Sequence, residues 1–166
     1  SSGARGISMG RQASATTADS VAIGTGARGG ASSAGGSVAV GGGAAATGTQ
    51  AIAIGGLYGN DLYSSTATKD GAGNLTKNTQ ASGEASIAMG VNTKATGTKA
   101  LAMGAEAQAK SEASVAVGVN AVSDKGIAIG KNSISRQDGS ISLGLGASNN
   151  GGVAIGEAAN AIVQST

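Results

Sequence analysis

The tetrapeptide "aliphatic, Ala or Ser, aliphatic, Gly" recurs ten times in this 166-residue chain, and it limits the possible folds more than any other feature. The copies are ISMG (7–10), VAIG (21–24), VAVG (38–41), IAIG (52–55), IAMG (87–90), LAMG (101–104), VAVG (115–118), IAIG (127–130), ISLG (141–144) and VAIG (153–156). Successive closing glycines are 14, 17, 14, 35, 14, 14, 12, 14 and 12 residues apart. Such a short period indicates a repeat architecture, in which each unit packs against the next.

Each repeat is predicted to form one coil of a β-solenoid. The tetrapeptide alternates with period 2, as a short strand does, and a second, weaker strand is expected in segments such as 107–109. About 14 residues are too few for a helix plus strands, and no window has a 3.6-residue period. We therefore predict an all-β parallel β-roll of about ten coils that stack by pairing parallel strands, as a single domain over residues 1–166.

The two sides of this strand predict a core and an interface. The large aliphatic residues are expected to fill the roll; they are Val21, Ile23, Val38, Val40, Ile52, Ile54, Ile87, Met89, Leu101, Met103, Val115, Val117, Ile127, Ile129, Ile141, Leu143, Val153 and Ile155. The small middle residues are then expected to contact a sister chain; they are Ser8, Ala22, Ala39, Ala53, Ala88, Ala102, Ala116, Ala128, Ser142 and Ala154. The opposite assignment also fits, with Ala inside a thin roll and Val or Ile at the interface. In both cases the thin core predicts a homo-oligomer.

The longest spacing, from Gly55 to Gly90, predicts an inserted loop or hairpin at about residues 56–81. The insert contains both tyrosines of the chain, Tyr58 and Tyr63, and its KDGAGN segment (69–74) has dipeptides typical of hairpin turns. Tyrosine is common at recognition surfaces, so these two residues are candidate ligand contacts. The alternative is that the insert only packs on its own coil or on a neighbouring coil.

Composition excludes several chemistries. The chain has no His and no Cys, so it cannot contain a Ser-His-Asp or Cys-His site or a thiolate metal centre. Nine carboxylates occur mostly singly in turns, with an Asp61/Asp70 cation site as an alternative in the insert. We predict no catalytic residues, no cofactor and no metal. A net charge of +2 with scattered cations and almost no aromatics gives little support for nucleic-acid binding.

One stretch, Gly24-Thr25-Gly26-Ala27-Arg28-Gly29, matches the G-x-G-x-x-G pattern of dinucleotide-binding loops. The residues that follow it stay small and turn-like through Gly36, so no helix is expected there. The other copies of the tetrapeptide are not followed by the full pattern of glycines. We interpret the match as a glycine-rich turn of a coil.

The segments SVAIG (20–24), SVAVG (37–41) and SVAVG (114–118), with the 14-residue period, resemble the repeats of YadA-like head domains in trimeric autotransporter adhesins of Gram-negative bacteria. The resemblance covers about residues 5–160. It implies a left-handed β-roll in a homotrimer, exposed at the cell surface on a stalk, with a β-barrel anchor in the outer membrane outside this fragment. It also implies a haemagglutinin-type role in attachment to host cells or extracellular-matrix proteins.

Two other functions use a similar fold. A structural surface fibre or spacer without its own receptor would need the same repeats. A hexapeptide-repeat acyltransferase is also a left-handed solenoid trimer, but its coils hold 18 residues and it typically uses a His base. The 14-residue period and the lack of His disfavour the acyltransferase.

Overall fold

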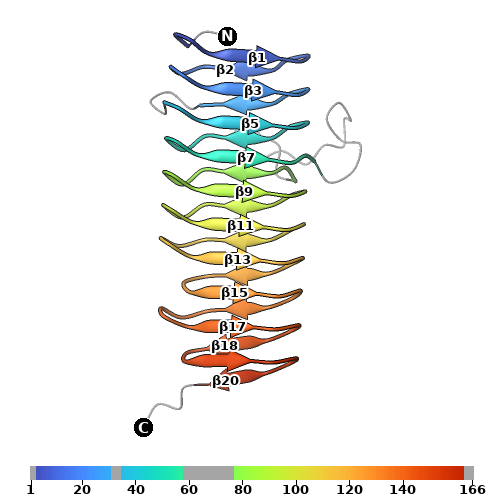
Figure 1. Cartoon of the computed structure of the whole chain (residues 1–166), viewed down its shortest axis with the longest axis vertical. Helices are drawn as coiled ribbons and strands as arrows, with labels where there is room; N and C mark the ends of the chain where they lie inside the picture. Colours follow the sequence, from blue (N-terminus) through green and yellow to red (C-terminus); the bar gives the residue numbers. More distant parts are fainter. Residues whose placement is uncertain (1–2, 31–34, 58–76, 163–166) are drawn as a thin grey trace.

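The computed structural model describes residues 3–30, 35–57 and 77–162. These residues form an elongated rod, with the N-terminus at one end and the C-terminus at the other (Figure 1). Every regular element in them is a β-strand, and the strands stack as ten coils in two parallel sheets. The predicted all-β solenoid of about ten coils is therefore confirmed. None of the described residues forms a helix long and apolar enough to cross a membrane.

The first sheet, sheet A, contains the tetrapeptide strands. They are β1 (Ile7–Met9), β3 (Val21–Ile23), β5 (Val38–Val40), β7 (Ile52–Ile54), β9 (Ile87–Met89), β11 (Leu101–Met103), β13 (Val115–Val117), β15 (Ile127–Ile129), β17 (Ile141–Leu143) and β19 (Val153–Ile155). Each strand pairs in parallel with the strands of the coils before and after it, so equivalent residues lie in register, as Leu101, Val115 and Ile127 do. The repeat therefore forms columns that run along the rod.

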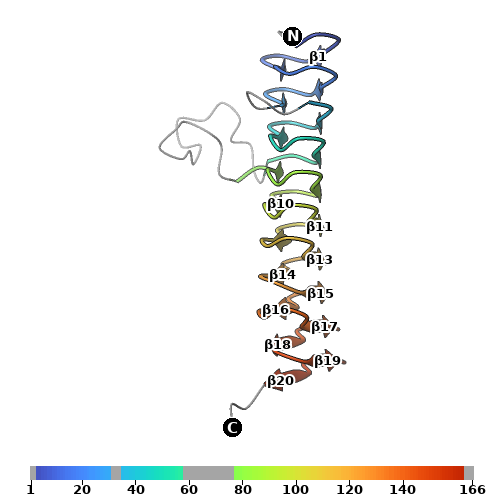
Figure 2. The ribbon, with the colours of Figure 1, turned by 90° about the vertical axis from the view of Figure 1, so that its left-hand side faces the viewer.

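The second sheet, sheet B, contains the weaker strands expected in the other half of each repeat. They are β2 (Ser14–Ala15), β4 (Arg28–Gly29), β6 (Ala45–Ala46), β8 (Gln80–Ala81), β10 (Lys94–Ala95), β12 (Gln108–Ala109), β14 (Val122–Ser123), β16 (Ile134–Ser135), β18 (Ser148–Asn150) and β20 (Asn160–Ile162). Figure 2 shows the two sheets as two thin layers. β6 and β8 pair directly, so the stack continues across the inserted segment.

The predicted assignment of the two sides of the sheet A strands is wrong, because the small residues point into the roll and the large aliphatic residues point outward. The column predicted to be an interface points into the roll. It consists of Ser8, Ala22, Ala39, Ala53, Ala88, Ala102, Ala116, Ala128, Ser142 and Ala154. All except the half-buried Ser8 are at most 3% exposed within a single chain. The column predicted to be the core is exposed or half-buried on the outside; it is Val21, Ile23, Val38, Val40, Ile52, Ile54, Ile87, Met89, Leu101, Met103, Val115, Val117, Ile127, Ile129, Ile141, Leu143, Val153 and Ile155.

The physical reason is the thinness of the roll. The Ser8 side chain in sheet A accepts a hydrogen bond at 2.8 Å from the backbone N–H of Ala15 in sheet B. The Ser142 hydroxyl likewise donates to the backbone oxygen of Ile134 at 2.7 Å. Because a serine side chain spans the gap between the sheets, a Val or Ile does not fit there. The main hydrophobic cluster accordingly consists only of alanines.

The closing glycines allow this tight stacking. Gly104 has a φ of +119°, in the region that side chains rarely adopt. A Cβ atom built there would lie 2.6 Å from the backbone oxygen of Gly118 in the next coil. In the GTGARG stretch, Gly24 and Gly26 have positive φ and the last two residues form strand β4, so this stretch is a coil turn that leads into a strand of sheet B.

Candidate binding surfaces

The rod presents two broad outer faces and two edges. The turns from sheet A to sheet B form one edge, called the A–B edge, and the turns from sheet B to sheet A form the other, called the B–A edge (Figure 1). Among the residues that the structure describes, no group of three or more His, Cys, Asp or Glu side chains could hold a metal ion.

The outer face of sheet A is apolar along the whole rod. Two residues of each sheet A strand point outward, and all of them are Val, Ile, Leu or Met. Ile23, Met103 and Ile129 are each 37% exposed, and Ile155 near the end of the stack is 66% exposed. Parallel pairing in register makes these side chains two continuous columns. Soluble monomers rarely expose contiguous apolar patches of this kind, which mark interaction sites.

The apolar surface extends onto the A–B edge. Val91, Val119 and Leu145 each follow the closing glycine of a coil, and they are 38%, 44% and 47% exposed. The described turns of the B–A edge carry polar and charged residues instead, such as Glu84, Lys99 and Glu112. The two edges of the rod therefore differ in chemistry.

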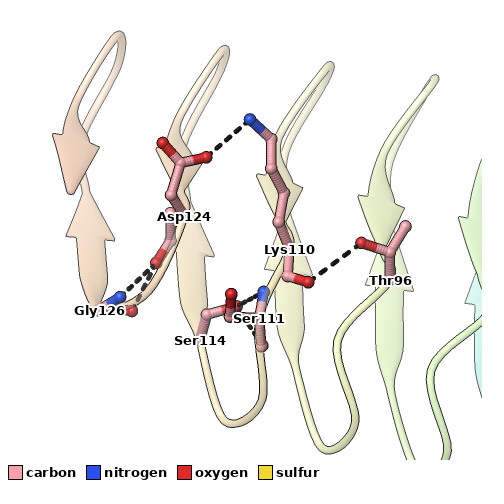
Figure 3. A network of polar contacts seen from close by, with 7 residues as sticks. Thr96, Lys110, Ser111, Ser114, Asp124 and Gly126 are labelled. Carbon is pink, nitrogen blue, oxygen red and sulfur yellow. Dashed lines mark hydrogen bonds and ion pairs between the residues drawn. The ribbon is translucent and has the colours of Figure 1, made fainter. Parts of the chain in front are cut away.

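The outer face of sheet B is mostly polar, with Val122, Ile134 and Ile162 as its large apolar side chains. Its outward column at the first strand position includes Ser14, Arg28, Gln80, Lys94, Gln108 and Ser148. A second outward column, two residues later, includes Thr16, Thr47, Ser82, Thr96, Lys110, Asp124 and Arg136. The Lys110 ammonium lies 2.7 Å from an Asp124 carboxylate oxygen of the next coil (Figure 3). This face was not predicted from the sequence, although a polar residue on each side of a small one, as in Lys94-Ala95-Thr96, indicates it.

The remaining predicted site residues lie outside the described part of the chain. Tyr58 and Tyr63, the candidate ligand contacts, fall in residues 58–76, and so do Asp61 and Asp70 of the alternative cation site. Their proposed roles stay predictions.

Comparison with known proteins gives one family. The model of the YadA head domain repeat matches residues 1–27, 32–57, 81–107, 95–121 and 121–147, which together are more than half of the chain. The matches leave out most of the predicted insert. A matching solved structure is the collagen-binding domain of the Yersinia adhesin YadA, which is 23% identical in sequence and has a TM-score of 0.38. The match covers 66% of this chain and 74% of the YadA chain. The comparison with curated proteins gave no match.

Proposed function

The chain belongs to the family of YadA head domain repeats, and we propose that it is the head of a bacterial surface adhesin that acts as a homotrimer. Membership of this family supports an adhesin-type, non-enzymatic role at the cell surface. The finer proposal is attachment to host cells or to extracellular-matrix proteins, with the head held outside the outer membrane by parts of the protein beyond this sequence.

The observation that carries the proposal is the continuous apolar face of sheet A. Val, Ile, Leu and Met along the whole rod lie outside a core built of alanine. Covering these side chains removes apolar area from water, at about 25 cal/mol per Å². A second and a third copy of the same chain present the same columns of apolar side chains at the same coil spacing. Each coil of one copy can therefore pack against a coil of another copy along the full length of the rod. This supports an assembly in which sheet A faces the axis.

The same arrangement supports adhesion. With sheet A turned toward the axis, the polar outer face of sheet B is turned toward the surroundings in every copy. Three identical faces on one rod bind a repetitive surface with higher avidity than one face does. A spacer without a receptor would have the same assembly, so a direct test of binding separates the two functions.

The assembly is tested by the mass in solution. Light scattering is expected to give three chains per particle for the natural protein, and Leu101→Asp is expected to give monomers because it places a charge in the apolar column. Gln108→Asp is the matched control, since Gln108 lies in the same coil on the outer face of sheet B, and it should stay trimeric. A natural chain that is a stable monomer contradicts the trimer.

Adhesion is tested with the purified trimer on cultured cells and on immobilised matrix proteins. We propose that the insert takes part through Tyr58 and Tyr63, so deletion of residues 58–76 is expected to weaken attachment while the mass stays that of a trimer. Unchanged attachment of the deletion variant contradicts the role of the insert. A folded trimer that attaches to nothing favours the spacer.

A further inference from the structure

Among the described residues, nearly all carboxylates lie on the edges of this rod, whereas cations lie both on the edges and on the outer face of sheet B. Of the seven carboxylates that the structure describes, six lie in turns on the two edges; they are Asp19, Glu84, Glu106, Glu112, Asp138 and Glu157. Asp124 is the one described carboxylate on the outer face of sheet B. That face carries four cations, which are Arg28, Lys94, Lys110 and Arg136. The sheet B face is therefore basic, although the whole chain has a net charge of only +2.

Three of these cations lie close together along the rod. Lys94, Lys110 and Arg136 occur within four successive coils, whose strands β10, β12, β14 and β16 pair directly. At about 4.8 Å per coil, they span roughly 15 Å. We call these three residues the basic column, although Lys94 lies in the first outward column of sheet B whereas Lys110 and Arg136 lie in the second. Its cations succeed one another along the rod axis, as a linear ligand would need.

Polar partners hold two members of the basic column in place. The Arg136 guanidinium donates a hydrogen bond of 2.9 Å to the Ser148 hydroxyl of the next coil. The Lys110 ammonium is held by Asp124, which also neutralises part of the charge of the column. Both ends of this ion pair are more than a third exposed, so solvent and a ligand can reach them.

A notch in the B–A edge continues this surface. The spacing of 12 residues between Gly118 and Gly130 leaves a short turn after β14, closed by hydrogen bonds between the Ser123 hydroxyl and Gly126. The edge recedes at this coil (Figure 1). An open depression of about 370 Å³ beside it is lined by Lys125, Arg136, Gln137 and Asp138. Arg136 therefore belongs to both the basic column and the notch.

The surroundings of the column fit a polysaccharide better than a nucleic acid. Most of the neighbouring outward side chains are hydroxyls and amides, which are Gln80, Ser82, Thr96, Gln108 and Ser148; Val122 and Ile134 are apolar and lie in register between Gln108 and Ser148. Such groups form hydrogen bonds with sugar hydroxyls. The described residues include no aromatic side chain on which bases could stack, and a flat sheet has no element that enters a groove.

We propose that the outer face of sheet B binds a linear anionic polysaccharide along the rod, with Lys94, Lys110 and Arg136 contacting its sulfate or carboxylate groups. This inference rests on the proposed adhesive function and names a partner for it. Asp124 lowers the affinity because it competes for Lys110. Three copies of the face on one trimer raise the avidity for a long chain.

The test is binding of the purified protein to immobilised heparin, a sulfated polysaccharide, with neutral dextran and double-stranded DNA as the other probes. Changing Lys94, Lys110 and Arg136 together to Gln is expected to weaken heparin binding about tenfold or more. Asp124→Asn is expected to strengthen it by about twofold to threefold. The matched control changes Lys77, Lys99 and Lys131 to Gln, which removes the same charge from the edges and is expected to have little effect.

Equal losses in the two triple variants contradict the inference, because a general charge effect would then explain the binding. Equally tight, equally charge-sensitive binding to DNA contradicts the polysaccharide class. Mass and attachment to cells are measured on the same preparation. A trimer that attaches to cells but does not bind heparin overturns this inference alone, whereas a monomer that does not attach overturns the proposed function too.

Discussion

The outer faces of sheets A and B are built from strands of the same coils, yet their chemistry is opposite. In the coil that contains β11 and β12, the outward residues of sheet A are Leu101 and Met103, whereas sheet B presents Gln108 and Lys110. Between them lie Ala102 and Ala109, both fully buried. The difference shows that the coil's own core needs only small residues. The large aliphatic residues are not needed for that core, and we propose that they serve a contact outside the chain.

The largest expected effect comes from enlarging a side chain between the sheets. Ala102→Leu is expected to lower the free energy of unfolding by about 3 kcal/mol or more, because the thin core has no space for three further carbon atoms. Gln108→Leu adds a leucine to the outside of the same coil and is expected to change it by less than about 0.5 kcal/mol. Denaturant unfolding measures both variants. A small cost for Ala102→Leu would contradict the thin core.

A hydrogen bond between the two sheets has the next largest effect. Ser142→Ala is expected to cost about 1 kcal/mol, because the backbone oxygen of Ile134 loses its partly buried hydrogen bond from the serine hydroxyl. Alanine fits the site, since Ala128 occupies the equivalent position in the preceding coil. Unchanged thermal unfolding of Ser142→Ala would show that this bond does not stabilise the pairing of the sheets.

A turn on the B–A edge offers a stabilising change. Ala113 is exposed and has a φ of +54°, which is unfavourable for alanine. Ala113→Gly is expected to raise the free energy of unfolding by about 0.5 kcal/mol, after the entropy of glycine is subtracted. Ala105→Gly, in a turn of the opposite edge without positive φ, is expected to lower it by about 0.5–1 kcal/mol. Loss of stability in both variants would contradict this account of the turn.

The smallest expected effect concerns the ion pair on sheet B. Asp124→Asn is expected to change the free energy of unfolding by about 0.5 kcal/mol or less, because Lys110 and Asp124 are both well exposed. Any loss should shrink as salt is added. A cost above about 1 kcal/mol that persists in high salt would assign the pair a structural role, instead of a role on a binding face.

The repeat predicted the coils and their tetrapeptide strands because a 14-residue unit with alternating residues has few other ways to pack. It could not tell which side of the strand points inward. Val and Ile usually fill cores, but the distance between the two sheets decides which side chains fit between them. Strands of two or three residues joined by tight turns hold the sheets close together, so only small side chains fit. The stronger signal was the Ala or Ser in all ten copies, since a column that holds only small residues marks the tightest space. The role of Asn149 at a shortened turn could not be predicted from the sequence. Its buried side-chain amide donates to the backbone oxygens of Ile141 and Gly152, and its side-chain oxygen accepts from the backbone N–H of Gly151.

The most direct test of the central claim compares the accessibility of the two faces in the assembled protein. The chain has no cysteine, so one introduced thiol is unique. Leu101→Cys and Gln108→Cys place it on opposite outer faces of the same coil. With a maleimide reagent, we expect the thiol at position 108 to react rapidly and the thiol at 101 to be protected until the protein is denatured. Equal, rapid reaction of both thiols in the native protein would show that the apolar face of sheet A is not covered by sister chains.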